Sequence, residues 1–109
     1  MRVDLPQGTL ETMVLKTLSW GPMHGYGIGN WIERISNTAL TVEEGSLYPA
    51  LHRLETRGWL ESEWRTTENN RRAKYYRLTS EGRKQFRALS KSWSYLVASV
   101  ALVLEATEP

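Results

Sequence analysis

Apolar residues recur along this chain at the spacing of three helices before any strand-like pattern begins. Residues 8–20 and 24–35 each predict an amphipathic helix, and Gly21-Pro22 separates the two. The first apolar face is formed by Leu10, Met13, Val14 and Leu18. The second is formed by Ile28, Trp31, Ile32 and Ile35, and the third by Leu47, Ala50, Leu51 and Leu54.

The start of the third helix stays open at this point. Thr41 followed by Glu44 resembles a capping box, but Pro49 would then lie in the helix interior, where proline removes a backbone hydrogen bond. A Ser46 cap would place Pro49 in the first turn and avoid that cost. With either start, the side chains that lie away from the apolar face are Ser46, Tyr48, Pro49, His52 and Arg53.

Two strand-like segments, residues 59–65 and 73–79, follow the third helix and are joined by a polar connection with a basic end. An amphipathic helix that leads into such a hairpin is typical of the winged helix-turn-helix. That unit places a helix in the DNA major groove and a β-ribbon against the neighbouring backbone. We therefore predict a mainly α (α+β) fold with a winged helix-turn-helix domain over residues 1–79.

The last predicted helix begins after a Thr79 cap and continues without a helix breaker to about Ala106. Its apolar residues repeat in heptads, and a helix of 27 residues would be about 40 Å long. A small core cannot cover that length, so we expect residues 80–109 to form a dimerisation helix whose first turns also pack within the chain. The predicted interface consists of Phe86, Leu89, Trp93, Leu96, Val97, Val100, Val103 and Leu104.

Three glycines, Gly25, Gly27 and Gly29, weaken the second predicted helix by up to about 1 kcal/mol each relative to alanine. We interpret them as positions where a neighbouring element approaches closely. The preceding His24 is predicted to pack or to cap the helix rather than to bind a ligand.

The net charge of +2 hides an uneven distribution along the chain. Residues 1–64 carry −3 and residues 92–109 carry −2, whereas residues 65–91 hold nine basic and two acidic side chains. One concentrated basic segment indicates a polyanion-binding protein, although charge alone is equally compatible with a solvated face. The basic residues that we predict to contact the DNA backbone or minor groove are Arg71, Arg72 and Lys74.

On the third helix, Tyr48 is predicted to contact a phosphate or a base edge, with packing against the second helix as the alternative. His52 and Arg53 point the same way, and arginine is the better candidate for two-pronged recognition of guanine. The tryptophans are interpreted mainly as packing residues. Trp59 and Trp64 are assigned to the core or hairpin, while Trp93 is either a packing anchor or the wall of an aromatic ligand pocket.

Other classes of function find little support in the sequence. The chain has no cysteine, which excludes disulfides and thiolate metal sites, and two histidines fall short of a zinc site. Asp4 is the only aspartate, and neither histidine has a paired carboxylate at useful spacing, so we expect no enzyme, cofactor or metal. The absence of a signal-like segment and of a membrane-length apolar run leads us to expect a soluble cytoplasmic protein.

Nearly the whole chain resembles the PadR family of transcriptional regulators, with a C-terminal helix similar to that of its short subfamily. The motifs that carry the resemblance are HGY-G-I at His24–Ile28, EEGSLYPALHRLE at Glu43–Glu55, RG-W-L-E at Arg57–Glu61 and KYYRLTSEG at Lys74–Gly82. One position departs from the family, because Gly27 stands where members usually carry an acidic residue.

The resemblance implies a dimeric repressor that reads an inverted-repeat operator in double-stranded DNA. It also implies that a small hydrophobic, aromatic effector can release the DNA, with the C-terminal helices coupling the two events; Trp93 is the expected effector contact. The alternative from another class is a winged-helix module that binds a protein partner and not DNA. The basic hairpin tip argues against that alternative.

Overall fold

The computed structural model describes residues 7–109, so Asp4 lies outside the described part of the chain. The helices are α1 (Gln7–Thr17), the 3-10 helix η1 (Leu18–Trp20), α2 (Gly25–Ile35), α3 (Glu44–Thr56) and α4 (Ser80–Leu104). The strands are β1 (Met23–His24), β2 (Leu60–Thr66) and β3 (Arg72–Leu78), arranged antiparallel in the order β1-β3-β2. The predicted mainly α, winged-helix fold is confirmed.

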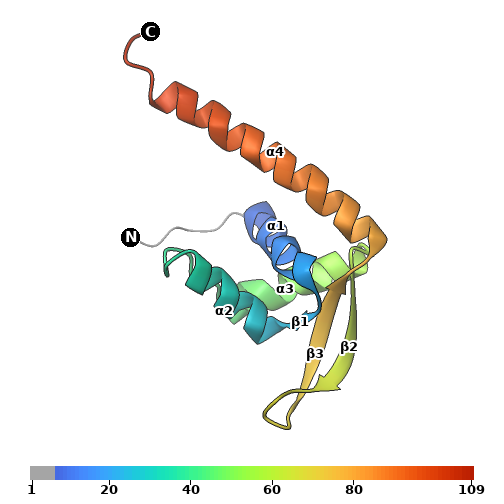
Figure 1. Cartoon of the computed structure of the whole chain (residues 1–109). Helices are drawn as coiled ribbons and strands as arrows, with labels where there is room; N and C mark the ends of the chain where they lie inside the picture. Colours follow the sequence, from blue (N-terminus) through green and yellow to red (C-terminus); the bar gives the residue numbers. More distant parts are fainter. Residues whose placement is uncertain (1–6) are drawn as a thin grey trace.

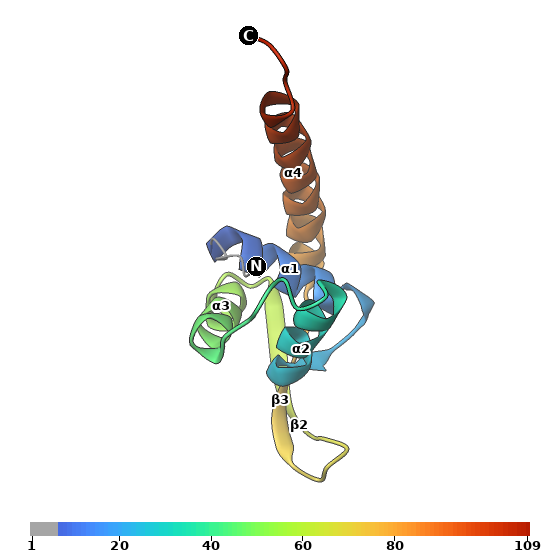
Figure 2. The same cartoon turned by 90° about the vertical axis from the view of Figure 1, so that its left-hand side faces the viewer.

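The molecule has an elongated shape, with extents of 59 × 31 × 22 Å. Helices α1, α2 and α3 form the body, the β2–β3 hairpin projects from one end of it, and α4 leaves on the opposite side (Figures 1 and 2). The tip of the hairpin and the free end of α4 are therefore far apart. A surface at the hairpin end can bind one partner while α4 binds another.

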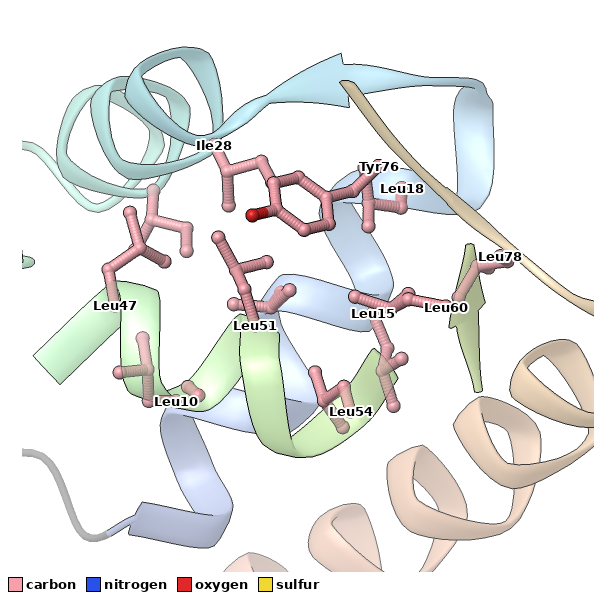
Figure 3. Close-up of a cluster of buried hydrophobic side chains, with 13 residues drawn as sticks. Leu10, Leu15, Leu18, Ile28, Leu47, Leu51, Leu54, Leu60, Tyr76 and Leu78 are labelled. Carbon is pink, nitrogen blue, oxygen red and sulfur yellow. The ribbon is translucent and has the colours of Figure 1, made fainter. Parts of the chain in front are cut away.

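The hydrophobic core lies where α1, α2 and α3 meet the base of the hairpin (Figure 3). Three of the four predicted apolar positions of the first helix, and all four of the third, are buried as expected. Helix α1 also buries Leu15, which lies outside its predicted face, because this helix packs against both α3 and α4. Ile35 was expected on the apolar face of the second helix. That prediction is wrong, because Ile35 is the last residue of α2 and is 62% exposed.

Both predicted starts of the third helix are wrong. Helix α3 begins at Glu44 after Glu43, whose side chain makes no capping hydrogen bond, and Pro49 lies inside the helix. With this start, Leu47 lies in the first turns of α3 and its side chain is buried in the core. Proline cannot donate to the carbonyl of Gly45, but this residue is exposed, so water can satisfy that oxygen.

The predicted role of His24 as a cap is confirmed. It precedes α2, and its Nδ1 accepts a hydrogen bond from the Gly27 backbone N–H at 3.0 Å. The predicted close approach at Gly25 is also observed, since a Cβ placed there would lie 2.8 Å from the Tyr48 ring. The two-residue strand β1, which pairs with Tyr75 and Tyr76 of β3, was not predicted, because a segment this short leaves no periodic pattern.

Thr79 caps α4 as predicted: its hydroxyl accepts from the Gly82 N–H at 2.9 Å and donates to the Gly58 carbonyl at 2.7 Å. The helix ends at Leu104, two residues before the predicted end. Phe86 and Leu89 pack against the core, which confirms that the first turns of α4 pack within the chain. Beyond them, the helix extends away from the body (Figure 1).

Replacement of Gly82 by alanine is expected to destabilise the protein by about 1–3 kcal/mol, because a Cβ there overlaps the backbone carbonyl of Trp59. This carbonyl already accepts the Thr79 N–H at 3.0 Å and cannot move freely. Urea unfolding measures the difference. The matched control is Gly8→Ala in α1, where no neighbour lies within 4 Å and the unfolding free energy should not fall. Equal stability of the two variants would contradict the expected overlap.

Candidate nucleic-acid interface

The exposed face of α3 carries four of the residues that the sequence assigned to DNA contact: Ser46, Tyr48, Pro49 and His52. Tyr48 combines both roles weighed for it, since its ring lies over Gly25 of α2 while 43% of the residue remains exposed. The contact limits the ring's freedom. Its exposed part can therefore meet a partner with little loss of side-chain entropy.

Glu55 connects α3 to the hairpin. Its carboxylate accepts a hydrogen bond from Ser62 of β2 and lies 3.3 Å from Nζ of Lys74 in β3. The Ser62 hydrogen bond and the Lys74 charge outweigh partial burial and lower the pKa of Glu55. Through these two contacts Glu55 joins α3 to both strands of the hairpin. Lys74, predicted as a DNA contact, thus has a structural partner within the protein.

The hairpin tip presents Arg71 and Arg72. Residues 67–71 connect the two strands, and the Thr67 N–H donates to the Arg71 carbonyl at 2.6 Å, which closes the loop. Both arginines are exposed, and within residues 7–109 neither forms an ion pair. Their charges are therefore available to an external anion.

Trp64 supports one of these arginines. The guanidinium of Arg72 lies 5.5 Å from the centre of the Trp64 ring, in the range of a cation–π contact. Of the two predicted roles of Trp64, packing within the hairpin agrees with this contact, whereas packing in the core is wrong, because this residue is 60% exposed. The β2–β3 hairpin projects beyond the helical body (Figure 1), which agrees with this exposure.

On the other face of the hairpin, the basic residues are neutralised. Nη2 of Arg77 lies 2.7 Å from Oε2 of Glu61, and Arg65 forms an ion pair with Glu63. The arginines of the hairpin are therefore divided: Arg65 and Arg77 are paired, whereas Arg71 and Arg72 at the tip have no partner within residues 7–109. This division favours an anion-binding tip over a uniformly solvated face.

A second ion-pair cluster lies between α1 and α3. Glu11 is 6% exposed; its Oε1 accepts from Nε of Arg53 and its Oε2 from Nη1 of Arg57, each at 2.9 Å. Burial alone would raise the pKa of Glu11, but the two arginines more than offset it and leave this pKa below its ordinary value. Arg53, the predicted guanine reader, is thus held against α1. The sequence did not single out Glu11, whose partners lie 42 and 46 residues away.

We expect the Glu11→Gln variant to be less stable than the wild type at neutral pH and to approach it in acid. The lowered pKa means that the ionised carboxylate stabilises the fold above its ordinary pKa of 4.5, and that this contribution is lost as the pH falls through the folded-state value. Unfolding free energies at about pH 7 and about pH 3 measure this. Glu63→Gln, at an exposed pair, is the control. A stability gap that stays constant with pH would contradict the assignment.

Three surface cavities of ≈ 180, 300 and 200 Å³ lie around α2, and Trp93 lines none of these three. Within residues 7–109 no group of three potential metal ligands comes together. In the same part of the chain, no helix is both long and apolar enough to cross a membrane.

Residues 14–88 match the transcriptional regulator PadR-like family. A PadR family transcriptional regulator from Eggerthella lenta is 34% identical, with a TM-score of 0.76 over 93% of this chain and 86% of that one. The protein smu.1704 from Streptococcus mutans, known from its crystal structure, is 29% identical in sequence, with a TM-score of 0.86 over 100% of this chain and 98% of that one. Transcriptional regulator Rv3488 of Mycobacterium tuberculosis is 43% identical over 56 residues, which is 50% of this chain and 51% of that protein. The fold, the exposed face of α3 and these similarities agree: the chain belongs to the PadR-like family of transcriptional regulators.

Proposed function

We propose that this protein is a dimeric DNA-binding repressor. The exposed face of α3 enters the major groove, and the hairpin tip contacts the phosphates or minor groove beside it. The observation that carries the proposal is that Arg71 and Arg72 have no ion-pair partner within residues 7–109 and lie on a hairpin whose Ser62 and Lys74 contact Glu55 of α3. Regulators of this family bind DNA and typically dimerise, which supports the same conclusion.

The electrostatics of the two surfaces support DNA over a protein partner. Arginines without an acidic partner release counterions when they meet phosphates, and this release favours binding to any nucleic acid duplex. The helix face adds Ser46, Tyr48 and His52, which can donate or accept hydrogen bonds at base edges. In this arrangement the tip supplies affinity and the helix supplies sequence preference.

Dimer formation would follow from the exposed apolar stripe of α4. Trp93, Leu96, Val97 and Val100 are 43–52% exposed, and Val103 and Leu104 at the helix end exceed 70%. Such a stripe on a helix that leaves the body favours pairing with the same helix of a second copy. A two-fold dimer would present two α3 helices, so the matching operator is an inverted repeat.

Selection of bound sites from a random double-stranded DNA library tests this function directly. We expect an inverted repeat whose half-sites lie about one helical turn, or a multiple of it, apart, with affinity that falls steeply as salt rises. A reporter placed downstream of the selected site should be less expressed when the protein is present. Failure to enrich any site, together with salt-insensitive retention of a protein partner, would favour the interaction module instead.

We further propose that a planar hydrophobic effector contacts Trp93 and releases the DNA. Trp93 lies on the exposed stripe of α4, where two copies of the helix could leave an apolar slot. Release requires that the effector prefer a different separation of the two α3 helices, since equal affinity for both arrangements shifts nothing.

The test uses a variant in which the other four tryptophans are replaced by phenylalanine. We expect phenolic and polyaromatic compounds to quench the fluorescence of Trp93 in this variant and to weaken its binding to the operator over the same concentration range. Titration of both signals on one sample measures the coupling. Quenching with unchanged DNA affinity would make Trp93 a packing residue, and no quenching would leave a repressor without this effector.

A further inference from the structure

We propose that Glu11 is a positioning residue for base recognition: it holds the Arg53 guanidinium so that its two terminal nitrogens face a guanine in the operator. This inference rests on the proposed DNA-binding function. It concerns α1, a helix that does not itself belong to the recognition face.

In the Glu11–Arg53 ion pair the carboxylate is buried, whereas the guanidinium is partly accessible to solvent. The Glu11 side chain is 8% exposed, whereas that of Arg53 is 33% exposed. The contact uses Nε of Arg53, at 2.9 Å from Oε1 of Glu11. Within residues 7–109, Nη1 and Nη2 of Arg53 form no hydrogen bond with the protein. The anchored edge of the guanidinium thus faces the protein, and donors remain on its terminal nitrogens.

The carboxylate that holds Arg53 is itself fixed. Its second oxygen, Oε2, accepts from Nη1 of Arg57 at 2.9 Å, and the Arg57 guanidinium lies 5.2 Å from the centre of the Trp59 ring. Two donors on two different oxygens prevent the carboxylate from rotating freely. Since one negative charge faces two positive charges, the cluster keeps a net positive charge at the edge of α3, which suits a surface that approaches DNA.

Arg53 also occupies a suitable position on α3. It lies four residues after Pro49 and three before Thr56, both exposed, so it borders the exposed face of the helix. A guanidinium offers its N–H donors in a planar fork that matches the O6 and N7 acceptors of guanine. Because Glu11 fixes the plane of this fork in advance, little side-chain freedom remains to be lost on binding.

A phosphate could accept hydrogen bonds from the same two nitrogens, so the test must separate recognition of a base from contact with the DNA backbone. Bound sites are selected from a random DNA library with the wild type, Arg53→Lys and Glu11→Gln. The matched control is Glu61→Gln, which removes the charge of another ion-paired glutamate without contact to Arg53. Arg53→Lys keeps a cation beside Glu11 but has no fork, so we expect it to fold. Circular dichroism and thermal unfolding establish the folded fraction of every variant.

We expect Arg53→Lys to lose discrimination for guanine at one position of each half-site, by about 5- to 150-fold. Glu11→Gln should weaken the same position by a smaller factor and leave the other positions unchanged, while Glu61→Gln should select the wild-type site. If Glu11 acts through Arg53, the double variant Glu11→Gln/Arg53→Lys should match Arg53→Lys alone.

Three results would overturn the proposal. Glu11→Gln could lower the melting temperature yet keep the full guanine preference, which would make Glu11 purely structural. Arg53→Ala could weaken all sequences alike and reduce the slope of log K against log salt by about 0.9 per protomer, which would assign Arg53 to a phosphate. Arg53→Lys could retain the wild-type site. In each of these cases the proposed DNA-binding function still stands if the wild-type protein enriches a DNA site. If the wild-type protein enriches no site, both the proposed function and this inference are refuted.

Discussion

Replacement of Arg71 and Arg72 together by alanine is expected to weaken binding to every DNA sequence by a similar factor. Removal of one arginine–phosphate interaction should reduce the slope of log K against log salt by about 0.9, hence by about 1.8 per protomer and about 3.6 per dimer for the pair. The contribution of counterion release to the binding free energy vanishes near 1 M salt. The change in slope for the dimer therefore corresponds to a roughly thousandfold weaker affinity at about 0.15 M salt. The physical reason is that both guanidinium groups lack an ion-pair partner within residues 7–109.

The matched control changes two arginines on the same hairpin, Arg65 and Arg77, to alanine. These are already paired with Glu63 and Glu61, so the slope should change much less although the net charge changes equally. Fluorescence anisotropy with a labelled duplex at several salt concentrations measures both variants. The assignment of the tip would fail if the Arg71/Arg72 variant kept the full salt slope.

Replacement of Leu96 by glutamate is expected to convert the dimer to monomer. Leu96 lies in the middle of the α4 stripe and is 52% exposed in the single chain, so its remaining apolar surface is available to a partner. Full burial of a leucine side chain contributes about 1.5–3 kcal/mol, and about half of this surface remains to be buried in the dimer, so a symmetric dimer loses about 1.5–3 kcal/mol in all. The dissociation constant should therefore rise by about 10- to 150-fold from the lost burial alone, and the cost of burying two charges adds to this.

The control for this change is Ala98→Glu, which introduces the same charge two residues away on the side of α4 opposite the heptad stripe. Sedimentation equilibrium at micromolar concentration should find a dimer for the wild type and for Ala98→Glu, and a monomer for Leu96→Glu. A monomer mass for the wild type would contradict the proposed assembly.

Local patterns allowed much of this fold to be predicted. The apolar face of α3 is buried in full, and the Thr79 cap forms as the sequence indicated. His24 likewise caps the helix that follows it. These features depend on residues within about one or two helical turns of one another, where periodicity and capping chemistry determine the structure.

The start of α3 marks the limit of such local reasoning. Two capping patterns competed in the sequence, and the helix adopted neither: it begins at Glu44 without a side-chain cap, and Pro49 lies inside it. Trp64 shows the same limit on the hairpin. The strand pattern left core packing and hairpin packing open, and the folded chain decides between them: the ring contacts Arg72 within the hairpin and stays largely exposed.

The sequence by itself determined the class of fold, the order of the main helices, the basic hairpin and the excess apolar surface of α4, because each follows from the spacing of residue types along the chain. Only the tertiary structure decided which charges are free. Arg53 and Lys74 are held by glutamates 42 and 19 residues away, while Arg71 and Arg72 are not paired within the described residues. Ion pairing depends on distances of a few ångströms between side chains, and those distances exist only after the helices and the hairpin have packed together.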